Sequence, residues 1–274
     1  MKTLFKVLIL LPLVFLSSCR SDDAETDQVT DLESKTYVLT SVEDSGISGT
    51  VRFIKNSNFT LSIELNVSGT INNNFHSAFL YRDNAANGGE VVALTLDTVV
   101  GETGMSTTVF TKLDDDTTIS YEDLLTFDGY IEVKSNDNTL NNPVANADIG
   151  ENELTGSQVT YTLEERDLTN AFGDITFKER INGEALAVFN LEGTPAGGML
   201  PAHIHENDAV TGGPIIFTFK MVNGTTGSSE TNVEMLDDGT SFVYNDVLTV
   251  NGYINVHFES DLSLLIAQGN IGSN

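Results

Sequence analysis

The segment FTLSIELNV, residues 59–67, alternates apolar and polar side chains along its whole length. Because successive side chains of a β-strand point to opposite faces, this period of two predicts a strand with one buried and one exposed face. Residues 51–53, 175–178 and 253–258 behave in the same way, and clusters of Gly, Asn and Asp separate such segments. The sequence therefore predicts many short antiparallel strands joined by turns.

The chain repeats itself. Tyr37-Val38-Leu39 matches Tyr161-Thr162-Leu163, 124 positions later, and Gly129-Tyr130-Ile131 matches Gly252-Tyr253-Ile254, 123 positions later. Further matches follow in the same order, with single-residue slips between them. Such ordered self-similarity indicates a duplication. We expect one module over residues 32–152 and a second over residues 153–274.

Helical periodicity is confined to about one turn in each copy, at residues 121–126 and again at residues 244–249. The predicted fold class is therefore all-β. We expect two tandem antiparallel β-sandwich modules with Greek-key-like connections, after a signal peptide and a flexible tether.

Composition excludes several classes of protein. The chain has 274 residues, with 40 Asp and Glu against 13 Lys and Arg and a formal net charge of -27. A nucleic-acid partner is excluded because backbone binding needs a clustered basic surface. The single Cys excludes an intrachain disulfide framework and a Cys-rich zinc module.

The first residues form a targeting segment. Lys2 and Lys6 precede an apolar run of about ten residues, which is shorter than the roughly 20 that span a bilayer. The run closes with Leu16-Ser17-Ser18-Cys19, which resembles a bacterial lipobox. We therefore expect a lipoprotein signal peptide over residues 1–18 and lipidation, such as palmitate, at Cys19. An ordinary signal peptide followed by a chance Cys is the alternative.

Residues 19–31 are polar and acidic, which predicts a flexible tether. An acidic run just after a lipidated Cys resembles the surface-export signal of Bacteroidetes lipoproteins. This resemblance implies an outer-membrane lipoprotein exposed at the cell surface and held to the membrane by its lipid anchor. The alternative is a solvated spacer on a lipoprotein that faces the periplasm.

The second module carries two separated signatures. The first is PAHIHENDAVTGGPII at residues 201–216, and the second is GYINVH at residues 252–257 followed by IAQGNIG at residues 266–272. Together they resemble the CHRD domain, named for chordin. The resemblance covers all of module 2 and, in degenerate form, module 1. It implies a β-rich extracellular module and says little about activity.

Three histidines of module 2 are candidate metal ligands. His203 and His205 are two positions apart, so in a strand they share a face, and His257 would come from another strand. Three neutral imidazoles can bind zinc or copper. The alternatives are a hydrogen-bonded structural cluster and a ligand contact without metal. Glu206 or Asp208 is a candidate fourth ligand, or one of them could fix the tautomer of a ligating imidazole through a hydrogen bond.

Module 1 lacks these imidazoles. Phe79, Tyr81 and Lys134 stand where module 2 has His203, His205 and His257. Because all three are replaced together, we interpret the histidines as one unit. His76 lies three residues before Phe79, in a segment that reads as a loop, and is interpreted as incidental.

The aspartates at 114–116 and 237–238 could ligate calcium, but their spacing is not that of an EF-hand loop and favours turns. Walker, GxSxG, HExxH and Rossmann motifs are absent from the sequence. We therefore predict a non-enzymatic lipoprotein that mediates binding or adhesion to an unknown protein or glycan, without a required cofactor. The alternative is a zinc- or copper-binding protein. Superoxide dismutase-like activity is not favoured, because a dinuclear site with a bridging imidazole would need all four histidines of the chain.

Overall fold

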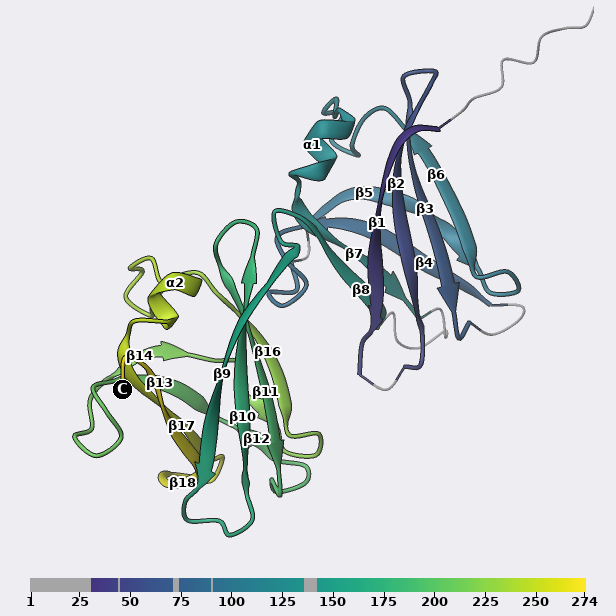
Figure 1. Cartoon of the computed structure of the whole chain (residues 1–274). Coiled ribbons are helices and arrows are strands. Elements are labelled where there is room, and N and C mark those ends of the chain that lie inside the picture. The colour runs from purple at the N-terminus through teal and green to yellow at the C-terminus, as the bar shows by residue number, and fades with distance from the viewer. Residues whose placement is uncertain (1–30, 44, 71–73, 90, 136–141) are drawn as a thin grey trace, which may run out of the picture.

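The computed structural model describes residues 31–43, 45–70, 74–89, 91–135 and 142–274. The predicted signal peptide, Cys19 and residues 20–30 of the tether lie outside these ranges. The described chain is almost entirely β-structure, as predicted, and its strands form two antiparallel sheets in two lobes (Figure 1). Within the described ranges, no helix has the length and apolar character needed to cross a membrane.

Module 1 forms a closed barrel in the order β1-β2-β3-β6-β5-β4-β7-β8. Its elements are β1 (Asp31–Ser41), β2 (Ser48–Asn56), β3 (Leu61–Ser68), β4 (Phe75–Arg82), β5 (Val92–Val100), β6 (Met105–Phe110), α1 (Tyr121–Leu125), β7 (Asp128–Lys134) and β8 (Pro143–Gly150). Two pairings close the ring. β1 meets β8 at Thr40 and Asn146, and β5 meets β6 at Val100 and Met105.

Module 2 forms a ten-stranded open sheet in the order β12-β15-β16-β11-β10-β9-β18-β17-β13-β14. Its elements are β9 (Leu154–Glu165), β10 (Phe172–Arg180), β11 (Ala185–Glu192), β12 (Met199–Leu200), β13 (Ala202–Glu206), β14 (Ile215–Thr218), β15 (Val222–Asn223), β16 (Ser228–Val233), α2 (Tyr244–Val247), β17 (Asn251–Phe258) and β18 (Asp261–Gly272). β13 and β17, the strands of the two CHRD-like signatures, are neighbours.

The two sheets share one strand order, except that the ring of module 2 is open between β14 and β16. The sequence predicted two β-sandwiches, whereas module 1 is a closed barrel and module 2 is a half-barrel whose sheet stays open. In both modules a threonine hydroxyl accepts a hydrogen bond from a backbone amide at this position of the ring. Asp97 N donates to Thr108 Oγ1 at 2.7 Å, and Lys220 N donates to Thr231 Oγ1 at 3.0 Å. Sequence periodicity predicts which face of a strand is buried, but it does not predict whether the last strand returns to the first.

Each module has its own apolar core. The alternating residues Leu61, Ile63, Leu65 and Val67 point into the barrel and are at most 5 % exposed. Phe59 continues the same period but is 95 % exposed, so the predicted strand begins two residues too early. Phe59 lies in the β2–β3 turn with a φ of 63°, where the chain has left the strand conformation.

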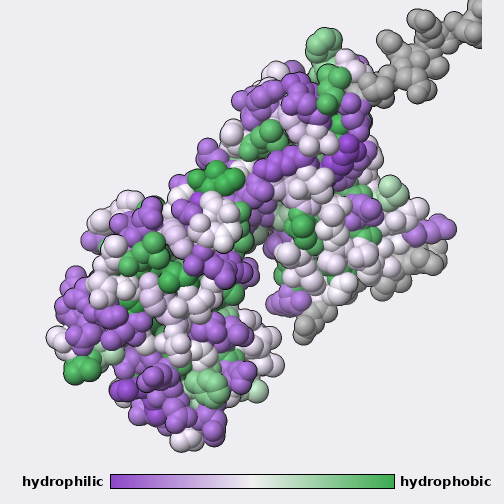
Figure 2. Space-filling model, in the orientation of Figure 1, coloured by the Kyte–Doolittle hydropathy of each residue, from purple (hydrophilic) through white to green (hydrophobic). Residues whose placement is uncertain are grey.

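A buried arginine joins the modules. Arg180 at the end of β10 is 0 % exposed, and its Nη1 donates to Asp148 Oδ2 of β8 at 2.7 Å and to the carbonyl of Asn152. Its Nε donates to Asn232 Oδ1 at 2.9 Å. Lys220 of module 2 also contacts the carbonyl of Ala86 in module 1. Both lobes present a mostly hydrophilic face (Figure 2), in keeping with the charge of the chain.

Candidate metal centre

His203 and His205 lie on the outer face of β13, opposite the core residue Ile204, as the sequence predicts. β17 pairs with β13, so that His203 is opposite Asn255 and His205 is opposite Tyr253. His257 follows on the same face of β17, at a register shift between β17 and β18. The geometry of two antiparallel strands therefore brings the three imidazoles to one place.

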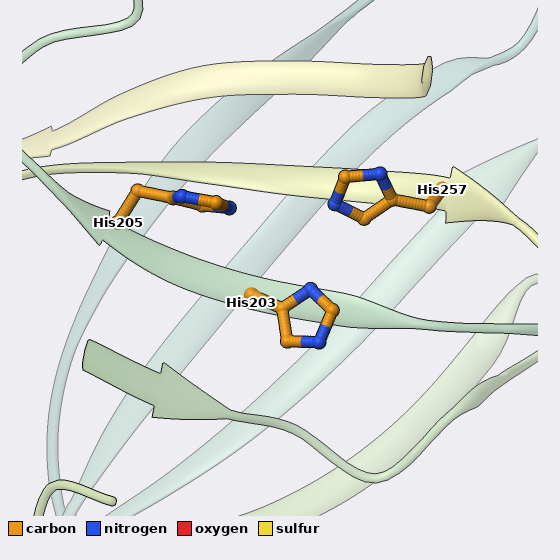
Figure 3. Close-up of side chains that lie close together, drawn as sticks. All are labelled: His203, His205 and His257. Carbon is orange, nitrogen blue, oxygen red and sulfur yellow. The ribbon is translucent and has the colours of Figure 1, made fainter. Parts of the chain in front are cut away.

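The three side chains converge (Figure 3). One ring nitrogen from each of His203, His205 and His257 lies within 4.8 Å of the others. The ring centroid of His203 is 6.1 Å from that of His205 and 5.3 Å from that of His257. His257 is 8 % exposed and the other two are half-buried. A single ion could contact all three after small rotations of the rings, since a Zn–N bond is about 2.0 to 2.1 Å long.

Backbone carbonyls orient two of the rings. Nδ1 of His205 lies 3.0 Å from the carbonyl oxygen of Gly213, and Nδ1 of His257 lies 2.8 Å from that of Leu262. Because a carbonyl oxygen only accepts, each Nδ1 carries the proton and donates it. In the neutral imidazole, Nε2 then carries the lone pair, which in His205 accepts from Asn255 Nδ2 at 3.4 Å. Such outer hydrogen bonds commonly fix the tautomer of a metal-ligating histidine.

His203 is different, because its Nδ1 is buried and has no hydrogen-bond partner among the residues that the structure describes. Buried polar atoms without partners are uncommon in native proteins and often mark a site where an ion or a water is bound. His203 belongs to the convergent group, so an ion held with His205 and His257 would give its ring a partner.

The sequence did not single out the side chains that surround the imidazoles. Tyr253 stacks on His205 with centroids 4.9 Å apart, and its hydroxyl accepts a bond from the Gly213 amide at 3.2 Å. Asn255 Nδ2 lies 3.4 Å from Nε2 of His205, and Asn255 Oδ1 accepts from Gln268 at 2.8 Å. Tyr253 and Asn255 precede His257 by four and two residues, so the period of the strand places them on the same face as His257.

Burial favours neutral imidazoles. It lowers the pKa of His203 below its ordinary value, and the nearby His257 and His205 lower it further. Burial also lowers the pKa of His257, against a smaller opposing effect of its bond to Leu262. Neutral imidazole is the form that binds metal.

The acidic candidates for a fourth ligand do not join the group. The Asp208 carboxylate accepts bonds from the amides of Val210 and Thr211 at 2.8 and 2.7 Å. Glu206 lies one position beyond His205 and therefore on the other side of the strand. The convergent group found among the described residues contains histidines alone, so a carboxylate ligand stays a prediction.

His76 lies in β4, not in a loop, and is 5 % exposed. Its Nδ1 lies 3.1 Å from the carbonyl of Lys134. The aspartates at 114–116 and 237–238 lie in turns. Asp114 and Asp237 accept the amide and hydroxyl of Thr95 and Thr218, respectively, at 2.8 to 3.0 Å.

Comparison with protein-family models, with curated proteins and with solved structures finds no match. The resemblance to the CHRD domain therefore stays a prediction from the sequence.

Proposed function

We propose that the protein binds a zinc or copper ion through His203, His205 and His257 of module 2. The convergence of three imidazole nitrogens from two paired strands carries this proposal. Imidazole donors suit zinc and copper, whereas calcium and magnesium prefer oxygen ligands. The proposed role is binding rather than catalysis, in an exported protein that a lipid at Cys19 holds to the outer membrane.

Two features favour a metal over a purely structural cluster. A structural cluster would use its nitrogens in hydrogen bonds, yet Nδ1 of His203 has no partner in the described part of the chain. The carbonyl contact of His257 leaves its Nε2 lone pair for an ion, and Nε2 of His205 accepts only a long contact of 3.4 Å from Asn255 Nδ2. Imidazole nitrogens gathered at one place favour a cation and offer little to an anion.

The experiment is a metal titration of the tag-free mature protein after chelation, with zinc and copper in competition with a chelator of known affinity. We expect one ion per chain. His203→Phe and His205→Tyr, which introduce the side chains of module 1, should each weaken binding by more than the ~10–100-fold caused by losing a group that only hydrogen-bonds to a ligand. Phe79→Leu is the matched control and should leave affinity unchanged. Equal binding by all variants would refute the proposal.

A second candidate function is the binding of a glycan or another polar ligand between the modules. Ligand sites are typically clefts of about 300 to 1,000 Å³, and the hollow between the lobes measures about 930 Å³. Hydroxyl and amide side chains from both modules line it, among them Thr40, Asn146 and Thr226, together with Lys220. A glycan array probed with wild type and with Thr226→Val would test this function. Identical, background-level signals would refute it.

A further inference from the structure

The outer face of module 1 has a cluster at the place where module 2 has its histidines. Phe79 and Tyr81 of β4 pair with Glu132 and Tyr130 of β7, in the register that His203 and His205 share with Asn255 and Tyr253. Tyr81 stacks on Tyr130 at 5.2 Å and 18°, and His205 stacks on Tyr253 at 4.9 Å and 18°. The two clusters are thus equivalent in backbone and in ring geometry.

A cation already occupies the cluster of module 1. Lys134 Nζ lies 5.7 Å from the centroid of the Phe79 ring and 5.2 Å from that of Tyr81, within the range of cation–π interactions. It also lies 3.2 Å from Glu132 Oε1. The Lys134 side chain is 19 % exposed and the Glu132 side chain 9 % exposed, so both charges are largely removed from water.

We propose that module 1 contains a binding site for a primary ammonium group, formed by Phe79, Tyr81 and Glu132, and that Lys134 of the same chain occupies it. The two aromatic rings attract the ammonium through their faces, and the carboxylate neutralises it. Burial alone would lower the pKa of Lys134, but Tyr81 and Glu132 outweigh it and raise this pKa. The ammonium therefore stays charged in the site.

This site is independent of the metal proposed for module 2. Glu132 is 6 % exposed, and Lys134 is its partner in an ion pair. Removal of the lysine would leave a buried carboxylate without that partner, which is strongly destabilising. It would also leave an aromatic space of the size of an ammonium group, which a small external alkylammonium ion can enter.

The experiment is chemical rescue of Lys134→Ala in the full mature chain. We expect a lower melting temperature in sodium chloride, and a saturable recovery when ethylammonium chloride replaces it at the same ionic strength. The double variant Lys134→Ala/Glu132→Gln should lose most of this recovery. Wild type should show no specific response to ethylammonium. Equal melting temperatures of Lys134→Ala in both salts would overturn the proposal.

A measurement on unmodified protein covers the case in which Lys134→Ala fails to fold. Protons near the face of an aromatic ring shift upfield, so the ε-methylene protons of Lys134 should resonate upfield of those of Lys112, which is 53 % exposed. Tyr81→Leu should reduce this shift. A Lys134 resonance at the position of Lys112 would overturn the proposal. Neither experiment depends on metal binding by module 2.

Discussion

The ring centroids of His203 and His257 lie 5.3 Å apart, although His203 is paired with Asn255 and not with His257. The two histidines form a diagonal pair across neighbouring antiparallel strands, where long side chains on one face can still meet. Lys134 reaches Phe79 across the equivalent diagonal in module 1. The same backbone relationship thus brings imidazoles together in one module and an ammonium onto aromatic rings in the other.

The junction between the modules should depend on the ion pair of Arg180 and Asp148. Arg180→Met leaves the Asp148 carboxylate, 17 % exposed, without its 2.7 Å partner. Breaking a buried pair by removing one partner costs about 3–5 kcal/mol. We expect a loss at the lower end of this range, measured by urea denaturation, and faster proteolysis at residues 151–154.

Asp148→Asn, which introduces the residue found at the equivalent Asn270, is the matched control. Combined with Arg180→Met, it should cost less than the sum of the two single changes. Additive effects would mean that the two side chains are not coupled.

Phe59 should be a destabilising residue. It adopts a φ of 63° at a position where module 2 has Gly183 with a φ of 87°, and its side chain is 95 % exposed. A left-handed conformation costs a non-glycine residue roughly 1–2 kcal/mol, and asparagine tolerates it better. Phe59→Asn should therefore raise the free energy of unfolding by about 0.5–1 kcal/mol.

The reciprocal change is Gly183→Ala. A Cβ at this glycine meets no atom of the described residues within 4 Å, so any loss of stability reports the backbone conformation alone. If Phe59→Asn lowers the free energy of unfolding, the prediction is wrong, and the Phe59 ring stabilises the folded state despite its exposure.

Glu234 should make stability depend on pH. Burial raises the pKa of its carboxyl group above 4.5, and the charges of Glu184, Asp83 and Asp128 raise it further. The folded state thus disfavours ionisation, and its stability falls relative to the unfolded chain as the pH rises above 4.5. Glu234→Gln should melt higher than wild type at pH 7, by up to ~2–4 °C.

Below pH 4 the two proteins should melt alike, because Glu234 is then protonated in both the folded and the unfolded state. A constant difference at every pH would show that the substitution acts through packing or hydrogen bonding. Scanning calorimetry from pH 3.5 to 7.5, with steps of roughly half a unit, gives the comparison.

Cys19 should anchor the mature protein. Cys19→Ala should abolish labelling with a palmitate analogue and move the protein from the detergent phase to the aqueous phase. Continued partition into detergent would contradict lipidation at this residue. Protease treatment of intact cells then distinguishes the faces of the membrane, and full protection would contradict surface exposure.

Part of this architecture was accessible from the sequence. The period of two and the repeat predicted strands and equivalent positions, and they placed His203 and His205 on one face. Closure of the barrel was not accessible, because it depends on pairings such as Thr40 with Asn146 that join distant strands. Phe59 was misassigned because the apolar period continues into the turn.

The partners of the site were less accessible. Gly213 and Leu262 orient imidazoles through their carbonyls, and every residue has a carbonyl, so no residue type marks them. The lysine site of module 1 was hidden for another reason. In the sequence, Lys134 marks only the replacement of His257. In the structure its ammonium lies over Tyr81, at the position where module 2 has its imidazoles.

The most direct test of the metal proposal is a crystal structure of the tag-free protein soaked with zinc, with anomalous data collected on both sides of the zinc absorption edge. We expect one strong peak within about 2.0 to 2.1 Å of one nitrogen from each of His203, His205 and His257. We expect none among Phe79, Tyr81 and Lys134. An empty space between the three histidines, with zinc bound only at surface carboxylates, would contradict it.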